Sequence, residues 1–391
     1  MLQTHRERAG ILPRKSTGAM KNRAVMNWLL VFAAIVAFLV VFGGFVRLTR
    51  SGLSITEWEP ISGTIPPLGE QAWLEEFAKY QQTPEYQQIN FGMTLEEYQY
   101  IFYIEWFHRF IARFAGLVYA IPVFYFLFTK KIPWRDFGIY FVMGMLFIAQ
   151  AFAGWVMVAS GLVDRPSVSH FNLTIHLLLA LALLGLAVWT ILGHRYGFPE
   201  KTTPAKWSWP SKLALVSFIL LVIQIAYGGM TAGLKAGHVS DTWPLMFGRL
   251  VPPNLFSSWI NLFEVPQTIV FIHRWFAFLG LISVPLVYYF AKKRGYPREI
   301  LSGLLVLTGV VALQITLGVL TVLSYVNIVV ALIHQANALV LFMLGIYFIH
   351  RLRALDRIHS QQGNISKSAI LPISDGEKAT NQRSWLRERA D

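Results

Sequence analysis

The chain has 391 residues, of which 55% are hydrophobic and only 14% are charged. Soluble domains carry about 25% charged residues, so this composition, with its long apolar runs, excludes a soluble globular protein and indicates an integral membrane protein. The absence of cysteine excludes disulfides, thiolate metal sites, iron–sulfur ligation and cysteine nucleophiles. The net charge of +13 does not indicate nucleic acid as a partner, because most basic residues follow the loop alternation of a membrane protein.

Eight apolar runs approach the roughly 20 residues that a membrane-spanning helix needs. Residues 1–25 precede them as a basic segment that is not typical of a cleaved signal peptide. We predict an all-α integral membrane fold with spans at residues 26–46, 104–128, 137–160, 170–193, 212–234, 268–290, 300–324 and 328–350. An acidic loop separates the first two spans, and its patterning predicts short surface helices at Gln71–Gln82 and Leu95–Tyr100. Residues 351–391 form a polar tail that we expect to be mobile.

Lysine and arginine are distributed unevenly between the two sides of these spans. Of the 34 basic residues, 25 lie in the N-terminal segment, the tail and the loops that share their side, and 6 lie in the opposite loops. Because basic loops stay on the cytoplasmic side, both termini are predicted to be cytoplasmic, and the acidic loop is predicted to lie outside. A bacterial inner membrane is favoured over a mitochondrial inner membrane.

The second half of the chain repeats the first. The copies share a Gly-Gly pair, a His-Arg pair, a Gln-x-x-x-Gly pattern and a later histidine, in the same order. The matched positions are Gly43-Gly44 with Gly228-Gly229, His108-Arg109 with His273-Arg274, Gln150 and Gly154 with Gln314 and Gly318, and His176 with His334. Four spans per copy give both copies the same orientation. The sequence therefore predicts two tandem four-helix bundles, at residues 26–193 and 212–350 with a cytoplasmic linker at 194–211, related by a pseudo-twofold axis along the membrane normal.

Four histidines lie within about two turns of the start of a predicted span, near the outer surface: His108, His176, His273 and His334. Polar groups inside a membrane are usually functional, and isolated packing histidines have no reason to occur in matched pairs. The other six histidines serve as controls, since four are predicted on the cytoplasmic side and two outside, as surface or interfacial residues. They are His5, His170, His194, His238, His350 and His359.

Two histidines facing each other within a helical bundle suit the two axial positions of a haem iron. Zinc or copper fits less well, because two imidazoles leave their coordination incomplete without carboxylates or thiolates. Basic residues near the outer surface are candidates to bind haem propionates, although simple snorkelling at the membrane interface explains them equally well. These are Arg109, Arg274, Arg50 and Lys235.

Glu105 breaks the symmetry of the repeat. It lies one helical turn before His108, whereas the matching residue in the second copy is Val270. A carboxylate beside a haem-sized site could transfer a proton or position a substrate, and a valine could do neither. Pairing with Arg109 is the alternative explanation for this glutamate. The asymmetry predicts one chemically active bundle and one that holds a cofactor.

At these motifs the sequence resembles the haem A synthase family of proteobacteria and mitochondria, over roughly residues 25–350. The resemblance is carried by the four histidines, by Glu105, and by two loop motifs, Gly43-Gly44-Phe45-Val46-Arg47-Leu48-Thr49-Arg50-Ser51-Gly52-Leu53-Ser54 and Trp58-Glu59-Pro60-Ile61-Ser62-Gly63-Thr64-Ile65-Pro66-Pro67. It implies oxidation of the haem O methyl group to a formyl by successive hydroxylations, which gives haem A for cytochrome oxidase. It also implies haem O at His108 and His176, a haem B cofactor at His273 and His334, and a catalytic role for Glu105. Some relatives carry an outer-loop cysteine pair, which this chain lacks.

Two other functions remain open at this stage. A di-haem b-type cytochrome that takes electrons from a quinol would use the same four histidines but would give Glu105 no necessary role. A haem transporter would suit an internal repeat, but transport sites usually lie at the midplane and these histidines lie near one surface. The expected partners are haem O and haem A, membrane lipid and an unidentified electron donor. Haem O synthase, cytochrome oxidase assembly factors and a second copy of the chain are further candidates.

Overall fold

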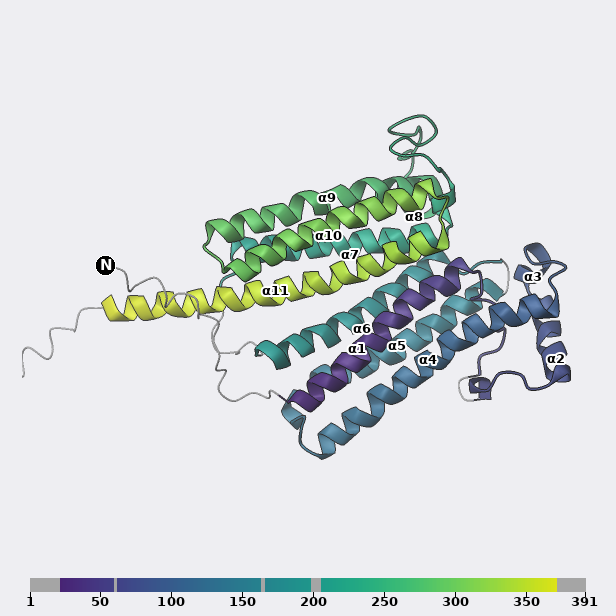
Figure 1. The fold of residues 1–391 in the computed structure, drawn as a ribbon, viewed down its shortest axis with the longest axis horizontal. Helices are drawn as coiled ribbons and strands as arrows, with labels where there is room; N and C mark the ends of the chain where they lie inside the picture. Colours follow the sequence, from purple (N-terminus) through teal and green to yellow (C-terminus); the bar gives the residue numbers. More distant parts are fainter. Residues whose placement is uncertain (1–21, 60–61, 163–165, 198–204, 371–391) are drawn as a thin grey trace, which may run out of the picture.

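The computed structural model describes residues 22–59, 62–162, 166–197 and 205–370. Within these ranges, eight helices are long and apolar enough to cross a membrane, as the sequence predicts (Figure 1). They are α1 (Arg23–Leu48), α4 (Leu95–Phe128), α5 (Phe137–Leu162), α6 (His170–Tyr196), α7 (Trp209–Gly233), α9 (Pro266–Lys293), α10 (Arg298–Leu323) and α11 (Ile328–Ile370). Three short helices lie in the connections, namely α2 (Glu70–Gln81), α3 (Pro84–Gln88) and α8 (Asn261–Glu264).

The acidic loop folds differently from the prediction in one respect. Helix α2 confirms the helix predicted at Gln71–Gln82, but Leu95–Tyr100 is not a separate surface helix. It forms the first turns of α4, because Thr94 and Glu97 make a capping box that starts the helix at Leu95. His108 therefore follows the first residue of α4 by 13 positions, so it does not lie within the first two turns of its helix as predicted.

The long helices form two rings of neighbours. Helices α1, α4, α5 and α6 contact one another in a closed ring, and α7, α9, α10 and α11 form a second (Figure 1). The rings, called the first and second bundle below, meet along α1, α6, α7 and α11, which we call the seam. This arrangement is compatible with the predicted tandem bundles, and the short helices α2, α3 and α8 lie at one common end of the helices.

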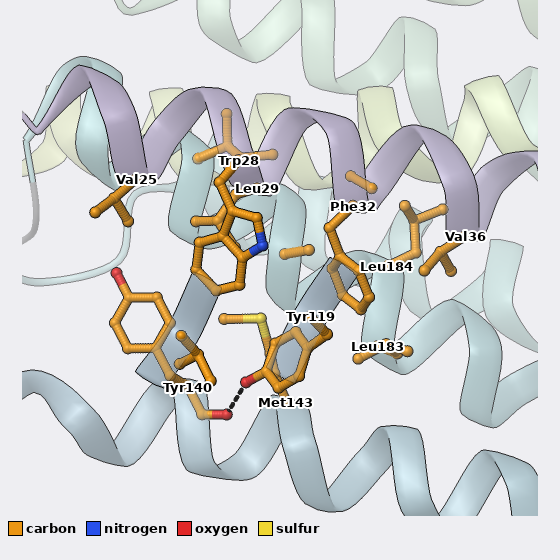
Figure 2. Close-up of a cluster of buried hydrophobic side chains, with 14 of the residues drawn as sticks. Val25, Trp28, Leu29, Phe32, Val36, Tyr119, Tyr140, Met143, Leu183 and Leu184 are labelled. Carbon is orange, nitrogen blue, oxygen red and sulfur yellow. Dashed lines mark hydrogen bonds between the residues drawn. The ribbon is translucent and has the colours of Figure 1, made fainter. Parts of the chain in front are cut away.

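The first bundle is packed around aromatic residues at the end opposite to α2 and α3 (Figure 2). Trp28 of α1 lies 5.7 Å from Tyr119 between ring centroids and donates a hydrogen bond to the Val118 carbonyl oxygen. The Tyr119 hydroxyl donates to the Tyr140 carbonyl oxygen, which joins α4 to α5. Since lipid is as apolar as these side chains, close packing and such hydrogen bonds hold the helices together.

Helix α11 continues 20 residues past the predicted end of the last span. The first part of the polar tail that we predicted from residue 351 is thus helical as far as Ile370. Asp356 is buried and accepts hydrogen bonds from Arg353 (3.0 Å), Tyr296 (2.9 Å) and the backbone N–H of Ser208 (3.2 Å). These bonds fasten the extension to the ends of its neighbours, so it remains helical beyond the apolar stretch.

Candidate functional site

The two histidines of the second bundle face each other. His273 of α9 and His334 of α11 have ring centroids 6.3 Å apart and ring planes at 81°. A histidine nitrogen binds a metal at about 2.0 Å, so two imidazoles on one iron would have their centroids roughly 6 Å apart. The sequence prediction that these histidines meet across helices is thus met by the geometry.

Hydrogen bonds orient both of these rings. His273 Nδ1 lies 3.2 Å from the Gln224 carbonyl oxygen, and a proton donated there leaves the lone pair on Nε2. His334 Nε2 lies 3.2 Å from the amide nitrogen of Gln314, whose own oxygen accepts a bond from Asn337 at 2.7 Å. The contact of His273 fixes its tautomer, as outer contacts do in metal-binding histidines. The Gln314 amide also lies 3.3 Å from His334 Nδ1, so it restrains the ring without selecting a tautomer.

The first bundle shares part of this arrangement. His176 Nε2 lies 3.2 Å from the amide nitrogen of Gln150, as the matched Gln314 does with His334. His108 has no glutamine, and it makes a hydrogen bond with the backbone of Leu39 instead. Sequence comparison missed the role of Gln224 because its counterpart in the repeat is this leucine.

Each of the four histidines packs against a glycine on the preceding span. A Cβ added to the glycine would lie 2.9 to 3.1 Å from the ring in three of the pairs, which is tighter than ordinary contact, and 3.4 Å from it at Gly43. The pairs are Gly43 with His108, Gly154 with His176, Gly228 with His273, and Gly318 with His334. Three of these four contacts would be closer than about 3.2 Å, so the repeated glycines are explained by the space that the histidines need.

Glu105 is buried at 3% exposure, and its hydrogen bonds lead to the segment after α1 and to its own helix. Oε2 accepts from the Ser54 hydroxyl at 2.8 Å and from the Ile55 N–H at 2.9 Å. Oε1 accepts from two nitrogens of Arg109, at 3.0 and 2.6 Å. The ion pair with Arg109 is therefore present, and Glu105 fastens the segment after α1 to the helix that carries His108.

The arginine that follows each first histidine clamps a loop in the same way in both bundles. Nη1 and Nη2 of Arg109 and Arg274 each donate to a carbonyl in the segment after the first helix of the bundle. The acceptors are Glu57 (3.3 Å) and Ile55 (3.1 Å) for Arg109, and Thr242 (3.0 Å) and Ser240 (2.6 Å) for Arg274. Both guanidinium groups donate to backbone carbonyls. Of the four basic residues predicted to bind propionates, Arg50 and Lys235 are therefore the better candidates.

Arg50 and Lys235 come together in a small hollow of about 40 Å³ at the end of the seam where α1 and α7 end. Arg47 also lines this hollow, and its Nη2 donates to the Ala232 carbonyl oxygen at the end of α7. Burial lowers the pKa of Lys235, and the nearby Arg50 and Arg47 lower it further. The sequence analysis did not single out Arg47, because its counterpart in the repeat is an alanine.

Glu85 of α3 is the acidic residue lining this hollow within the described ranges. Burial, and then the charge of Glu105, raise the pKa of Glu85 from 4.5 to about 7. Lys235 and Arg47 act in the opposite direction, but they do not offset the burial. The hollow thus carries excess positive charge, which favours an anionic ligand.

Three of the control histidines are buried, so the prediction that they are surface or interfacial residues is wrong for them. His170 Nε2 lies 2.8 Å from the Phe263 carbonyl oxygen, and His194 Nε2 lies 2.9 Å from the Tyr140 hydroxyl. His350 packs edge-on against Trp189. Their burial comes from neighbouring helices, whose approach cannot be predicted from the sequence of one span.

The donor set at the four histidines fits haem. The described residues contain no group of three or more histidine, cysteine, aspartate or glutamate side chains that could enclose a metal ion. Two imidazoles per bundle are what a porphyrin-bound iron requires, since the macrocycle supplies the other ligands. His176 Nδ1 is buried without a hydrogen-bond partner, as a ring nitrogen awaiting a ligand or a rotation would be.

The fold and this site define a class: a polytopic helical membrane protein with two matched histidine pairs suited to haem. The family model described as cytochrome oxidase assembly protein (COX15-CtaA) matches residues 26–346. The chain belongs to this family.

Several curated relatives carry the name heme A synthase. The protein of Wolbachia pipientis wMel is 41% identical over 346 residues, which cover 88% of this chain and 96% of the relative. That of Maricaulis maris is 41% identical over 336 residues, covering 83% and 94%. That of Brucella ovis is 42% identical over 332 residues, covering 83% and 90%.

Proposed function

We propose that this chain is a haem A synthase, an enzyme that oxidises the methyl group of haem O to a formyl by successive hydroxylations. The observation that carries the proposal is the asymmetry between two otherwise matched histidine pairs. Glu105 lies buried one turn from His108, whereas Val270 takes its place beside His273. The name of the relatives supports the same activity, with haem A for cytochrome oxidase as the product.

The second bundle holds the cofactor in this proposal. His273 and His334 would hold haem B, which would supply one-electron redox chemistry. Gln224 orients the His273 ring through its carbonyl oxygen, 3.2 Å from Nδ1, and the Gln314 amide restrains the His334 ring at 3.2 Å. Val270 leaves this bundle without an acid at the position of Glu105, which suits a site that passes electrons and transfers no proton.

The first bundle holds the substrate. His108 and His176 bind haem O, and Gly43 and Gly154 leave room for their rings. Glu105 does not stand free beside the site but holds the Ser54–Ile55 segment over the outer end of α4. Glu105 would therefore serve the reaction as an ionic anchor that holds this segment on the helix of His108.

The basic hollow at the seam binds haem propionates. Arg50 belongs to the first bundle and Lys235 to the second, and both line the same space. Arg47 adds a third cation one turn beyond Gly43, the residue that touches His108. A carboxylate placed there would relieve the repulsion between these cations.

We place the protein in a bacterial inner membrane with both termini in the cytoplasm, on the basis of the lysine and arginine distribution. The histidine pairs then lie towards the outer side. The reaction needs an electron donor, and haem O must come from a haem O synthase in the same membrane. Cytochrome oxidase assembly factors and a second copy of the chain are the remaining candidate partners.

The test is a conversion assay in a host that makes haem O but lacks its own haem A synthase. Extracted haems are separated by chromatography with and without expression of this chain. Haem A, or a hydroxylated intermediate, that depends on the chain supports the proposal. Two equivalents of haem B with haem O left unconverted would instead identify a di-haem cytochrome.

A further inference from the structure

Gln335 makes a polar contact across the seam. It directly follows His334 on α11, and its Nε2 donates a hydrogen bond to the Val40 carbonyl oxygen of α1 at 2.8 Å. The side chain lies on the backbone of α1 at Gly44, where an added Cβ would be 1.8 Å from Oε1 of Gln335. Only glycine at position 44 admits the amide in this position.

The other crossing of the seam has the same geometry but no such bond. Gly229 of α7 matches Gly44, and an added Cβ there would lie 3.4 Å from Leu177 and 3.0 Å from Thr174 Oγ1. Leu177 directly follows His176, as Gln335 follows His334, and the Thr174 hydroxyl donates within its own helix. The hydrogen bond from the Gln335 side-chain amide therefore has no counterpart at the other crossing of the seam.

This contact joins two histidines that belong to different bundles. Gly44 adjoins Gly43, and a Cβ on Gly43 would lie 3.4 Å from His108 Nε2. From His334 the connection runs through Gln335 to the backbone of α1 and on to His108. An amide hydrogen bond in an apolar membrane interior has no competing water, so it holds α11 in a fixed register against α1.

We propose that Gln335 is a positioning residue that couples the two histidine pairs, so that a change of ligation at His108 alters the site at His273 and His334. The proposal rests on the haem ligation proposed above. The repeat alone would supply only an apolar contact here, as it does at Leu177. The hydrogen bond from Gln335 to Val40 links α11 of the second bundle to α1 of the first.

The experiment follows haem at the second bundle by electron paramagnetic resonance of the purified full-length protein. His108→Ala is compared in the wild-type background and in Gln335→Leu, which keeps the size of the side chain and copies Leu177. We expect His108→Ala to shift the low-spin g-values of this haem in the wild type, and the shift to fall at least twofold in Gln335→Leu. A shift of equal size in both backgrounds, or none in either, overturns the proposal.

A second set of variants tests whether the effect arises at the contact between Gln335 and Gly44. Gly44→Ala should displace the flexible amide of Gln335 and reproduce the Gln335→Leu result, and it should add nothing in a Gln335→Ala background. Gly309→Ala is the matched control, because no atom lies within 4 Å of a Cβ added there. A full effect of Gly44→Ala without the Gln335 side chain contradicts the proposal. A wild-type protein that binds no haem overturns the ligand assignment, and this proposal with it.

Discussion

The two bundles differ most where the repeat would lead one to expect a match. Arg109 and Arg274 hold their loops by the same pair of backbone contacts, and both first histidines pack against a matched glycine. At the position between these features, one bundle buries a carboxylate with four hydrogen bonds and the other buries Val270 at 2% exposure. The surroundings of the first histidine are thus shared, and the buried acid is present in one bundle only.

The largest effect is expected from Glu105→Gln. The variant removes the negative charge while it keeps the size and one hydrogen-bonding oxygen, so we expect loss of haem A formation with haem B retained at the second bundle. The measurement is haem extraction after expression with haem O supplied. Wild-type yields of haem A from this variant would remove the basis for assigning chemistry to the first bundle.

Val270→Glu places a carboxylate in the second bundle, at the position that matches Glu105 in the first. Val270 packs against Ala236 and Met246, so a carboxylate there meets an apolar cluster, although Arg274 lies one turn away. We expect a loss of about 2–4 kcal/mol in the free energy of unfolding, because the charge is buried with an incomplete set of partners. Thermal unfolding in detergent measures it, with Val270→Thr as the control of similar shape. A variant as stable as the wild type would show that the second bundle can accept the acid.

Glu85→Gln should have a smaller effect that depends on pH. The folded pKa of Glu85 is raised from 4.5 to about 7 by burial, so the folded state retains its proton to higher pH than the unfolded chain does. Wild type and variant should therefore unfold alike near pH 4.5. The wild type should lose stability as the pH rises towards 7, by at most about 3 kcal/mol. Unfolding temperatures of both proteins across this range test the direction of the pH dependence. A variant less stable than the wild type at pH 8 would contradict the prediction.

The sequence was sufficient for the membrane fold, and it singled out the histidines and Glu105 of the proposed site but not Gln224 or Arg47. Hydropathy predicted eight spans because every spanning helix needs a long apolar run. The repeat singled out the four histidines and the unmatched Glu105, since a residue that breaks a pattern is visible in a single sequence. The close packing of the histidines against glycines explains why those glycines recur, which the pattern alone could not.

Features that depend on contacts between distant segments were not predictable. The capping box at Thr94 extends α4, and the partners of Asp356 extend α11 beyond the apolar run. Gln335 reaches a carbonyl 295 residues away, and no local pattern distinguishes it from an exposed glutamine. Burial of His170 and His194 likewise arises from neighbours that the sequence does not place.

The most direct test of the division of labour is the haem composition of two paired variants, His108→Ala and His273→Ala, purified from a host that makes haem O. We predict that His108→Ala keeps haem B and loses haem O and haem A, whereas His273→Ala loses haem B. Loss of the same haem from both variants, or full haem content in His273→Ala, would contradict the assignment of substrate to the first bundle and cofactor to the second.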